Sequence, residues 1–173
     1  MIWIRRLRLA LLVLGGVVLQ VTLFSDSLRI LGVTADVGLV LTIAVAYYGG
    51  PELGAIYGFT AGLAIDCFLT TPTGLSALSF ALVGYGVGAL QTGLVRASRW
   101  IAPLLGGLGA LAGGVIFILI GALVGEDQLI SLHSVKVLIV ASLYDAVLAF
   151  VAFPVGRWAT RLPGVPVRGW RGG

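Results

Sequence analysis

Six long apolar stretches constrain this chain more than any other feature of its sequence. A helix needs about 20 mostly apolar residues to cross the hydrocarbon core of a bilayer. The stretches that approach this length are Leu7–Phe24, Val33–Tyr48, Leu53–Leu69, Leu75–Val95, Ile101–Val124 and Val135–Phe153. The sequence therefore predicts an all-α polytopic membrane protein, a bundle of six transmembrane helices.

Composition supports this fold class. Of the 173 residues, 59% are hydrophobic and only 10% are charged, whereas a soluble domain carries about 25% charged residues. No polar linker divides the chain, so we expect one transmembrane domain over residues 1–162. The Gly- and Pro-rich residues 163–173 are expected to form a flexible cytoplasmic tail.

The basic residues predict the orientation of the chain. Most of them lie on alternate connections between the apolar stretches: Arg5, Arg6, Arg8, Arg96, Arg99, Arg157, Arg161, Arg168 and Arg171. The opposite side holds only Arg29 and Lys136. Because Lys and Arg favour cytoplasmic loops, we expect a multi-pass protein with both termini in the cytoplasm. The net charge of +4 then reflects topology in a lipid bilayer, and no nucleic-acid partner is expected.

The first apolar stretch also has the basic start of a signal peptide. A cleavage site needs small residues, and the stretch ends instead in Thr22, Leu23 and Phe24. We therefore expect a retained helix.

Small residues recur at four-residue spacing, which places them on one helix face. In the third stretch these are Gly54, Gly58 and Gly62, and the fourth stretch contains Gly84 and Gly88. A face without side chains lets another backbone approach closely. The five glycines therefore predict a helix-packing or partner interface, which we expect to lie mostly within the chain.

Three carboxylates lie in or beside the apolar stretches. Asp66 continues the glycine face of the third stretch, Asp36 lies at the outer mouth of the second, and Asp145 lies near the middle of the sixth. Intramembrane carboxylates are costly and are candidate functional groups. The sequence leaves three interpretations open: an ion or proton relay, a cationic-substrate site, and structural groups that are protonated or hydrogen-bonded, for example to hydroxyls near Ser142 and Tyr144.

Catalytic and metal-binding patterns are weak. His133 is the only histidine and Cys67 the only cysteine, so neither an HExxH nor a CxxC motif is present. The segment from Gly74 to Ala77 resembles the serine stretch of intramembrane rhomboid proteases, with Ser76 as the serine. The glycine expected after that serine is Ala77, however, and we interpret His133 as a loop residue. We expect no enzymatic activity, no metal and no cofactor.

The order of features from Leu19 to Leu90 resembles the rod shape-determining protein MreD family. That family has a Pro-Asp pair that opens the second helix and a Gly-Phe-x-x-Gly-Leu-x-x-Asp pattern in the third. Gly58, Gly62 and Asp66 match the second pattern, whereas Ala35 replaces the proline before Asp36. Beyond this segment, the chain matches the family only in helix number and length.

The resemblance implies a non-catalytic scaffold in the bacterial inner membrane. Members of the family belong to the cell-wall elongation machinery and associate with MreC. Through MreC they connect with MreB, RodA and penicillin-binding protein 2.

The family also resembles, in fold, the S components of energy-coupling-factor vitamin transporters, which provide the alternative function. S components commonly dock through an Ala-x-x-x-Ala stripe in the first helix, whereas here Leu14 follows Ala10. They also need a polar pocket near the outer face. This chain offers Asp36, Asp66, Gln128 and His133 there, with few aromatic residues to stack on a vitamin.

Overall fold

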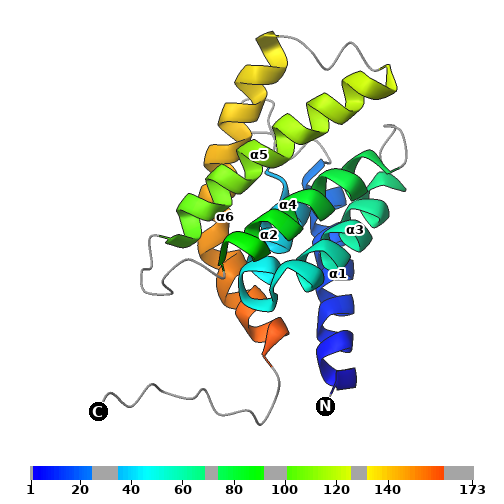
Figure 1. The fold of residues 1–173 in the computed structure, drawn as a ribbon, viewed down its shortest axis with the longest axis vertical. Coiled ribbons are helices and arrows are strands. Elements are labelled where there is room, and N and C mark those ends of the chain that lie inside the picture. The colour runs from blue at the N-terminus through cyan, green and yellow to red at the C-terminus, as the bar shows by residue number, and fades with distance from the viewer. Residues whose placement is uncertain (1, 25–34, 69–73, 92–100, 126–131, 162–173) are drawn as a thin grey trace.

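The fold is entirely helical over the described part of the chain, as the sequence predicts. The computed structural model describes residues 2–24, 35–68, 74–91, 101–125 and 132–161. Within these ranges there are six helices and no strand (Figure 1). They are α1 (Ile2–Phe24), α2 (Val37–Gly49), α3 (Pro51–Asp66), α4 (Leu75–Gln91), α5 (Ile101–Val124) and α6 (Leu132–Thr160).

Several predicted features lie outside the described residues. These are Arg29, Arg96, Arg99, Gln128, the tail at residues 163–173 and the side chain of His133. Several predicted boundaries differ from the structure. Helix α1 begins at Ile2 rather than Leu7, α3 begins at Pro51 rather than Leu53, and α6 runs over Leu132–Thr160 rather than Val135–Phe153. The second helix begins at Val37 rather than Val33, and the third ends at Asp66 rather than Leu69, with Cys67 and Phe68 in a turn.

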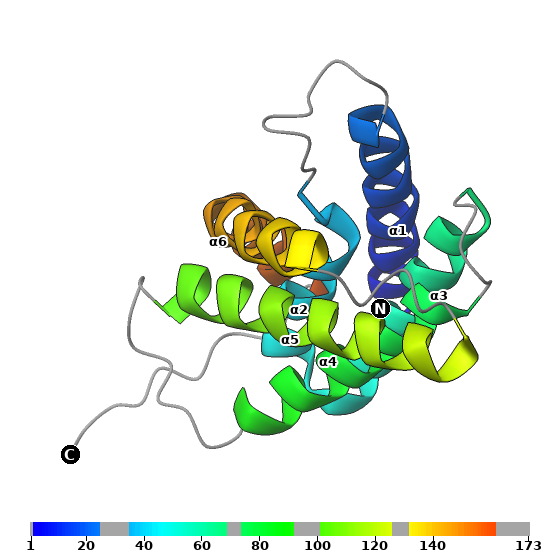
Figure 2. The same ribbon diagram turned by 90° about the horizontal axis from the view of Figure 1, so that it is seen from above.

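Helix α2 forms the centre of the bundle. Every residue from Val37 to Tyr47 is buried, and α2 contacts all five other helices. A helix that is apolar on all sides is stable only when neighbours cover it completely. Figure 2 shows α2 in the middle of the bundle, with α1 and α3 on one side, α6 on the other and α5 crossing over it.

Two glycines with positive φ shape the connections. Gly50, with φ 87°, is the single residue between α2 and α3, and its N–H donates to the carbonyl of Ala46. Pro51 then occupies the first turn of α3, where a missing N–H costs nothing. Gly74, with φ 105°, precedes α4, and its carbonyl accepts from Leu78 N–H. A side chain is strained at either position.

The outer helices present large apolar side chains to the surroundings. Leu119 of α5 is 59% exposed, and Leu143 and Val147 of α6 are 64% and 67% exposed. Among the described residues, Leu104–Val124 and Lys136–Thr160 are long and apolar enough to cross a membrane. Helices α2 and α4 are apolar but shorter, at about 20 and 26 Å. The described part of the chain thus has two candidate membrane spans, and a crossing by all six helices stays a prediction.

Candidate functional site

The predicted glycine face of α3 lies against α4. The two helices run antiparallel, and the predicted glycines of α4, Gly84 and Gly88, lie on the facing side (Figure 1). A Cβ atom built on Gly54 would lie 2.6 Å from the Gly84 carbonyl oxygen, and one on Gly88 would lie 2.5 Å from Pro51 Cα. These are backbone atoms, which cannot turn away as a flexible side chain can. We call this contact the α3–α4 seam.

The middle of the seam is equally close. A Cβ on Gly58 would collide with the carbonyl of Phe80, and one on Gly62 would lie 2.6 Å from Ala77 Cα. Thr42 of α2 closes the seam from the third side, because its methyl carbon would lie 2.8 Å from the same Gly58 Cβ. The weak helix propensity of glycine is therefore offset by close backbone contact between helices.

Asp66 lies at the end of the seam and binds the start of α4. Its carboxylate Oδ2 accepts from Gly74 N–H at 2.7 Å and from Ala77 N–H at 3.3 Å, and its Oδ1 accepts from Ser76 N–H at 3.3 Å. The side chain is only 2% exposed. The first N–H groups of a helix have no partner within the helix. The last residue of α3 thus supplies the acceptors for the N–H groups in the first turn of α4. Its carboxylate also lies at the N-terminus of α4, where the helix dipole favours negative charge.

The start of α2 is held in the same way, by side chains of two other helices and by its own N-cap residue, Asp36. Asp145 Oδ1 of α6 accepts from Asp36 N–H at 2.8 Å. Gln20 Oε1 of α1 accepts from Val37 N–H at 2.7 Å, and Asp36 Oδ1 itself accepts from Leu39 N–H at 3.1 Å. Gln20 and Asp145 are 4% and 2% exposed. The central helix therefore begins in the interior with side-chain acceptors on successive N–H groups.

These contacts change the interpretation of Asp145. The sequence suggests a hydroxyl near Ser142 or Tyr144 as its partner, whereas the partner in the structure is the backbone N–H of Asp36. The Ser142 hydroxyl donates within its own helix, to the carbonyls of Leu138 and Ile139. The geometry thus places all three predicted carboxylates at helix starts, Asp66 at α4 and the other two at α2.

The sequence gives weaker signals for two other residues. Gln20 is a polar residue in the otherwise mostly apolar second half of α1, which marks it as a candidate, but nothing local identifies Val37 as its partner. Ser76 of the protease-like segment is 4% exposed, and its N–H donates to the Asp66 carboxylate. In the described ranges, no three His, Cys, Asp or Glu side chains lie close enough to hold a metal ion.

Comparison with known proteins adds no assignment. The chain matches no family model, no curated protein and no solved structure.

Proposed function

We propose that this chain is a non-catalytic, multi-pass scaffold of the bacterial inner membrane that resembles the MreD family. In this proposal it maintains rod shape by binding MreC and linking it to MreB, RodA and penicillin-binding protein 2 in the cell-wall elongation complex. All six helices cross the membrane, in the manner of the S-component fold, and both termini lie in the cytoplasm.

The observation that supports the proposal is the joint role of the family-like motif on α3. Gly58 and Gly62 lie against the backbone of α4, and Asp66 accepts from its first N–H groups. Gly58, Gly62 and Asp66 therefore serve the α3–α4 pair, whereas Phe59 and Leu63 of the motif are 48% and 38% exposed. Such a motif is typical of a protein whose function depends on a rigid helical framework.

The positions of the charges and apolar groups agree with a membrane location. The start of α1 and the end of α6 lie at the same end of the molecule (Figure 1). There, Arg8 donates to the carbonyls of Trp158 and Arg161 at 3.3 and 3.5 Å. Basic residues at one end and exposed aliphatic residues along α5 and α6 match a bundle whose basic end faces the cytoplasm.

The vitamin-transporter alternative needs free polar groups for a substrate. Two of its candidate residues, Asp36 and Asp66, accept backbone N–H bonds at helix starts. This use of the carboxylates favours the scaffold over the S component.

Affinity capture tests the proposal. The tagged chain is extracted from its native membrane in gentle detergent, and the co-purifying proteins are identified by mass spectrometry. The expected result is MreC together with the wall-synthesis pair, all absent from a capture with an unrelated tagged multi-pass protein. Recovery of two ATPase subunits with a transmembrane coupling protein would instead identify a vitamin importer.

A further inference from the structure

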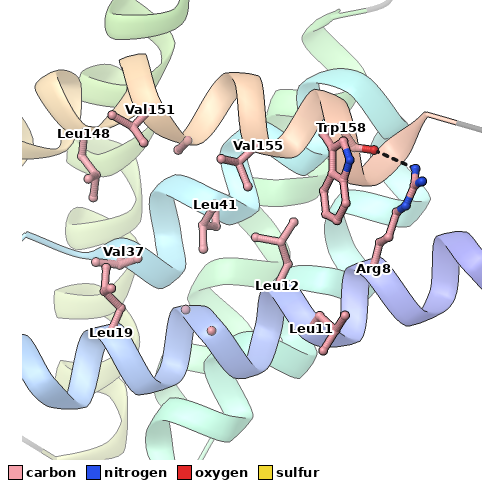
Figure 3. A pocket seen from close by; sticks show the side chains of 13 residues that line it. Arg8, Leu11, Leu12, Leu19, Val37, Leu41, Leu148, Val151, Val155 and Trp158 are labelled. Carbon is pink, nitrogen blue, oxygen red and sulfur yellow. Dashed lines mark hydrogen bonds between the residues drawn. The ribbon is translucent and has the colours of Figure 1, made fainter.

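Two adjoining pockets lie along α1 and α6. The first, which we call the apolar groove, lies between α1, α2 and α6 and has a volume of about 400 Å³ (Figure 3). Apart from Arg8 and Trp158 at one end, its lining is aliphatic or glycine: Leu11, Leu12, Gly15, Gly16, Leu19, Val37, Leu41, Leu148, Val151, Ala152 and Val155. Gly15 leaves the groove open, because a Cβ atom there would meet nothing within 4 Å.

The second pocket, which we call the arginine pocket, lies at the end of the groove. It has a volume of about 390 Å³ and is lined by Arg8, Tyr48, Pro154, Arg157, Trp158 and Arg161. These described lining residues include three arginines and no carboxylate. Arg8 and Trp158 line both pockets, so the arginine pocket and the apolar groove adjoin at these two side chains.

The electrostatics of the arginine pocket favour an anion. The carbonyl end of α6 carries a partial negative charge of about half a unit, which by itself would repel one. Arg8 donates to two of the carbonyls at that end, and its guanidinium lies 4.7 Å from the centre of the Trp158 ring. The exposed Arg157 and Arg161 then add two full positive charges. Guanidinium groups bind phosphate oxygens in a planar, two-pronged geometry.

The length of the groove fits one leaflet of a bilayer. Leu19 follows Arg8 by eleven positions along α1, a rise of about 16.5 Å. Half of a hydrocarbon core of about 30 Å is about 15 Å. Figure 3 shows Arg8 and Trp158 at one end, and Leu19, Val37 and Leu148 at the other. A ligand that fills both pockets thus has an anionic head and an aliphatic tail of about one leaflet.

We propose that the two pockets together bind one membrane phospholipid whose head group carries a net negative charge. Its phosphate lies among Arg8, Arg157 and Arg161, and one acyl chain lies in the apolar groove. Tyr48 and Trp158 border the head group, where aromatic rings are favoured at the membrane interface. This inference requires that the chain lies in a membrane, but it does not depend on the partners proposed above.

Two variants separate the head-group contact from the chain contact. Arg157→Gln/Arg161→Gln removes two exposed charges and leaves the groove intact. Gly15→Leu places a side chain in the groove and leaves the arginines in place, and its Cβ atom would meet nothing within 4 Å. The matched controls are Arg6→Gln, an exposed arginine that lines neither pocket, and Gly86→Leu, another helical glycine whose Cβ would meet nothing within 4 Å.

The experiment measures lipid retention. The full chain and the four variants are purified in detergent with phosphatidylglycerol or phosphatidylcholine, and bound lipid is counted by native mass spectrometry. Circular dichroism and thermal unfolding establish that every variant is folded. We expect one phosphatidylglycerol per wild-type chain, and retention reduced about tenfold or more by the arginine pair and clearly by Gly15→Leu. Both control variants should retain phosphatidylglycerol like the wild type. Phosphatidylcholine should not be retained by the wild-type chain.

Two results would overturn the inference. Equal phosphatidylglycerol retention by all five proteins would mean that neither pocket holds the lipid. Retention that falls only in the arginine pair, with displacement by millimolar inorganic phosphate, would identify a free-phosphate site without a lipid chain.

Discussion

Replacement of Asp66 tests whether this carboxylate serves only as a helix cap or whether its negative charge is itself needed for function. In Asp66→Ala, the three N–H groups of Gly74, Ser76 and Ala77 lose their acceptor. A buried donor left unsatisfied costs about 1–3 kcal/mol, and loss of an N-cap costs about 0.5–2 kcal/mol. Allowing for partial relaxation of the loop, we expect the free energy of unfolding to fall by about 3 kcal/mol.

Asp66→Asn should cost less. Oδ2 serves two of the three donors, Gly74 and Ala77, and an amide oxygen can occupy that place. The amide nitrogen then faces the Ser76 N–H, so this N–H group loses its acceptor. We expect a reduction of about 1–2 kcal/mol in the free energy of unfolding.

Thermal unfolding of the purified chain in detergent, followed by circular dichroism, measures both effects. Taking about 2–4 °C per kcal/mol for a chain of this length, Tm should fall by about 9 °C for Asp66→Ala and about 4 °C for Asp66→Asn. Glu52→Gln is the matched control, because it removes an exposed carboxylate in the first turn of α3. Its effect should stay within about 0.5 kcal/mol.

The order of the Tm values decides the interpretation. A Tm for Asp66→Ala equal to that of the wild type would refute the capping role. Unchanged stability of Asp66→Asn together with lost partner capture would show that the charge itself is used.

Two further predictions concern packing and topology. Gly58→Leu should lower the free energy of unfolding by about 3 kcal/mol or more, since the new side chain meets the Phe80 carbonyl. The control Gly86→Leu should leave both unfolding and partner capture close to wild type. Normal rod growth with both Gly58 and Gly62 replaced by Leu would contradict the packing role. A periplasm-dependent reporter fused after Gly173 should be silent if an even number of helices crosses the membrane, and activity there would contradict that topology.

The helices of this fold could be predicted from the sequence because their signals are local. Each apolar stretch lies within one segment, and residues four apart share a helix face whatever the tertiary structure. The glycine face of α3 is such a local pattern. The single-residue connection at Gly50, followed by Pro51, also follows local preferences, because glycine and proline end and restart helices through their own backbone geometry.

The partners of the carboxylates could not be predicted, because they depend on contacts between distant segments. Asp36 and Asp145 are 109 residues apart in the chain, and Gln20 and Val37 are 17 apart. The acceptors bind backbone N–H groups, which every residue except proline carries, so no side-chain pattern marks the donor. The arginine pocket escaped prediction for the same reason, since Arg8 and Arg161 come from opposite ends of the chain.

The helix caps also explain why polar residues occur in so apolar an interior. A helix that starts inside a membrane protein exposes N–H groups where no water can reach them, and each costs several kcal/mol if unsatisfied. Helix α2 is about 20 Å long and buried from Val37 to Tyr47, so its start needs acceptors from the protein itself. Gln20 and Asp145 supply them from α1 and α6, and thereby fix those helices relative to the centre. A carboxylate held in this way is a poor candidate for a transport relay, whose groups must exchange partners. The same contacts suit a framework that must keep its outer faces in constant positions for binding.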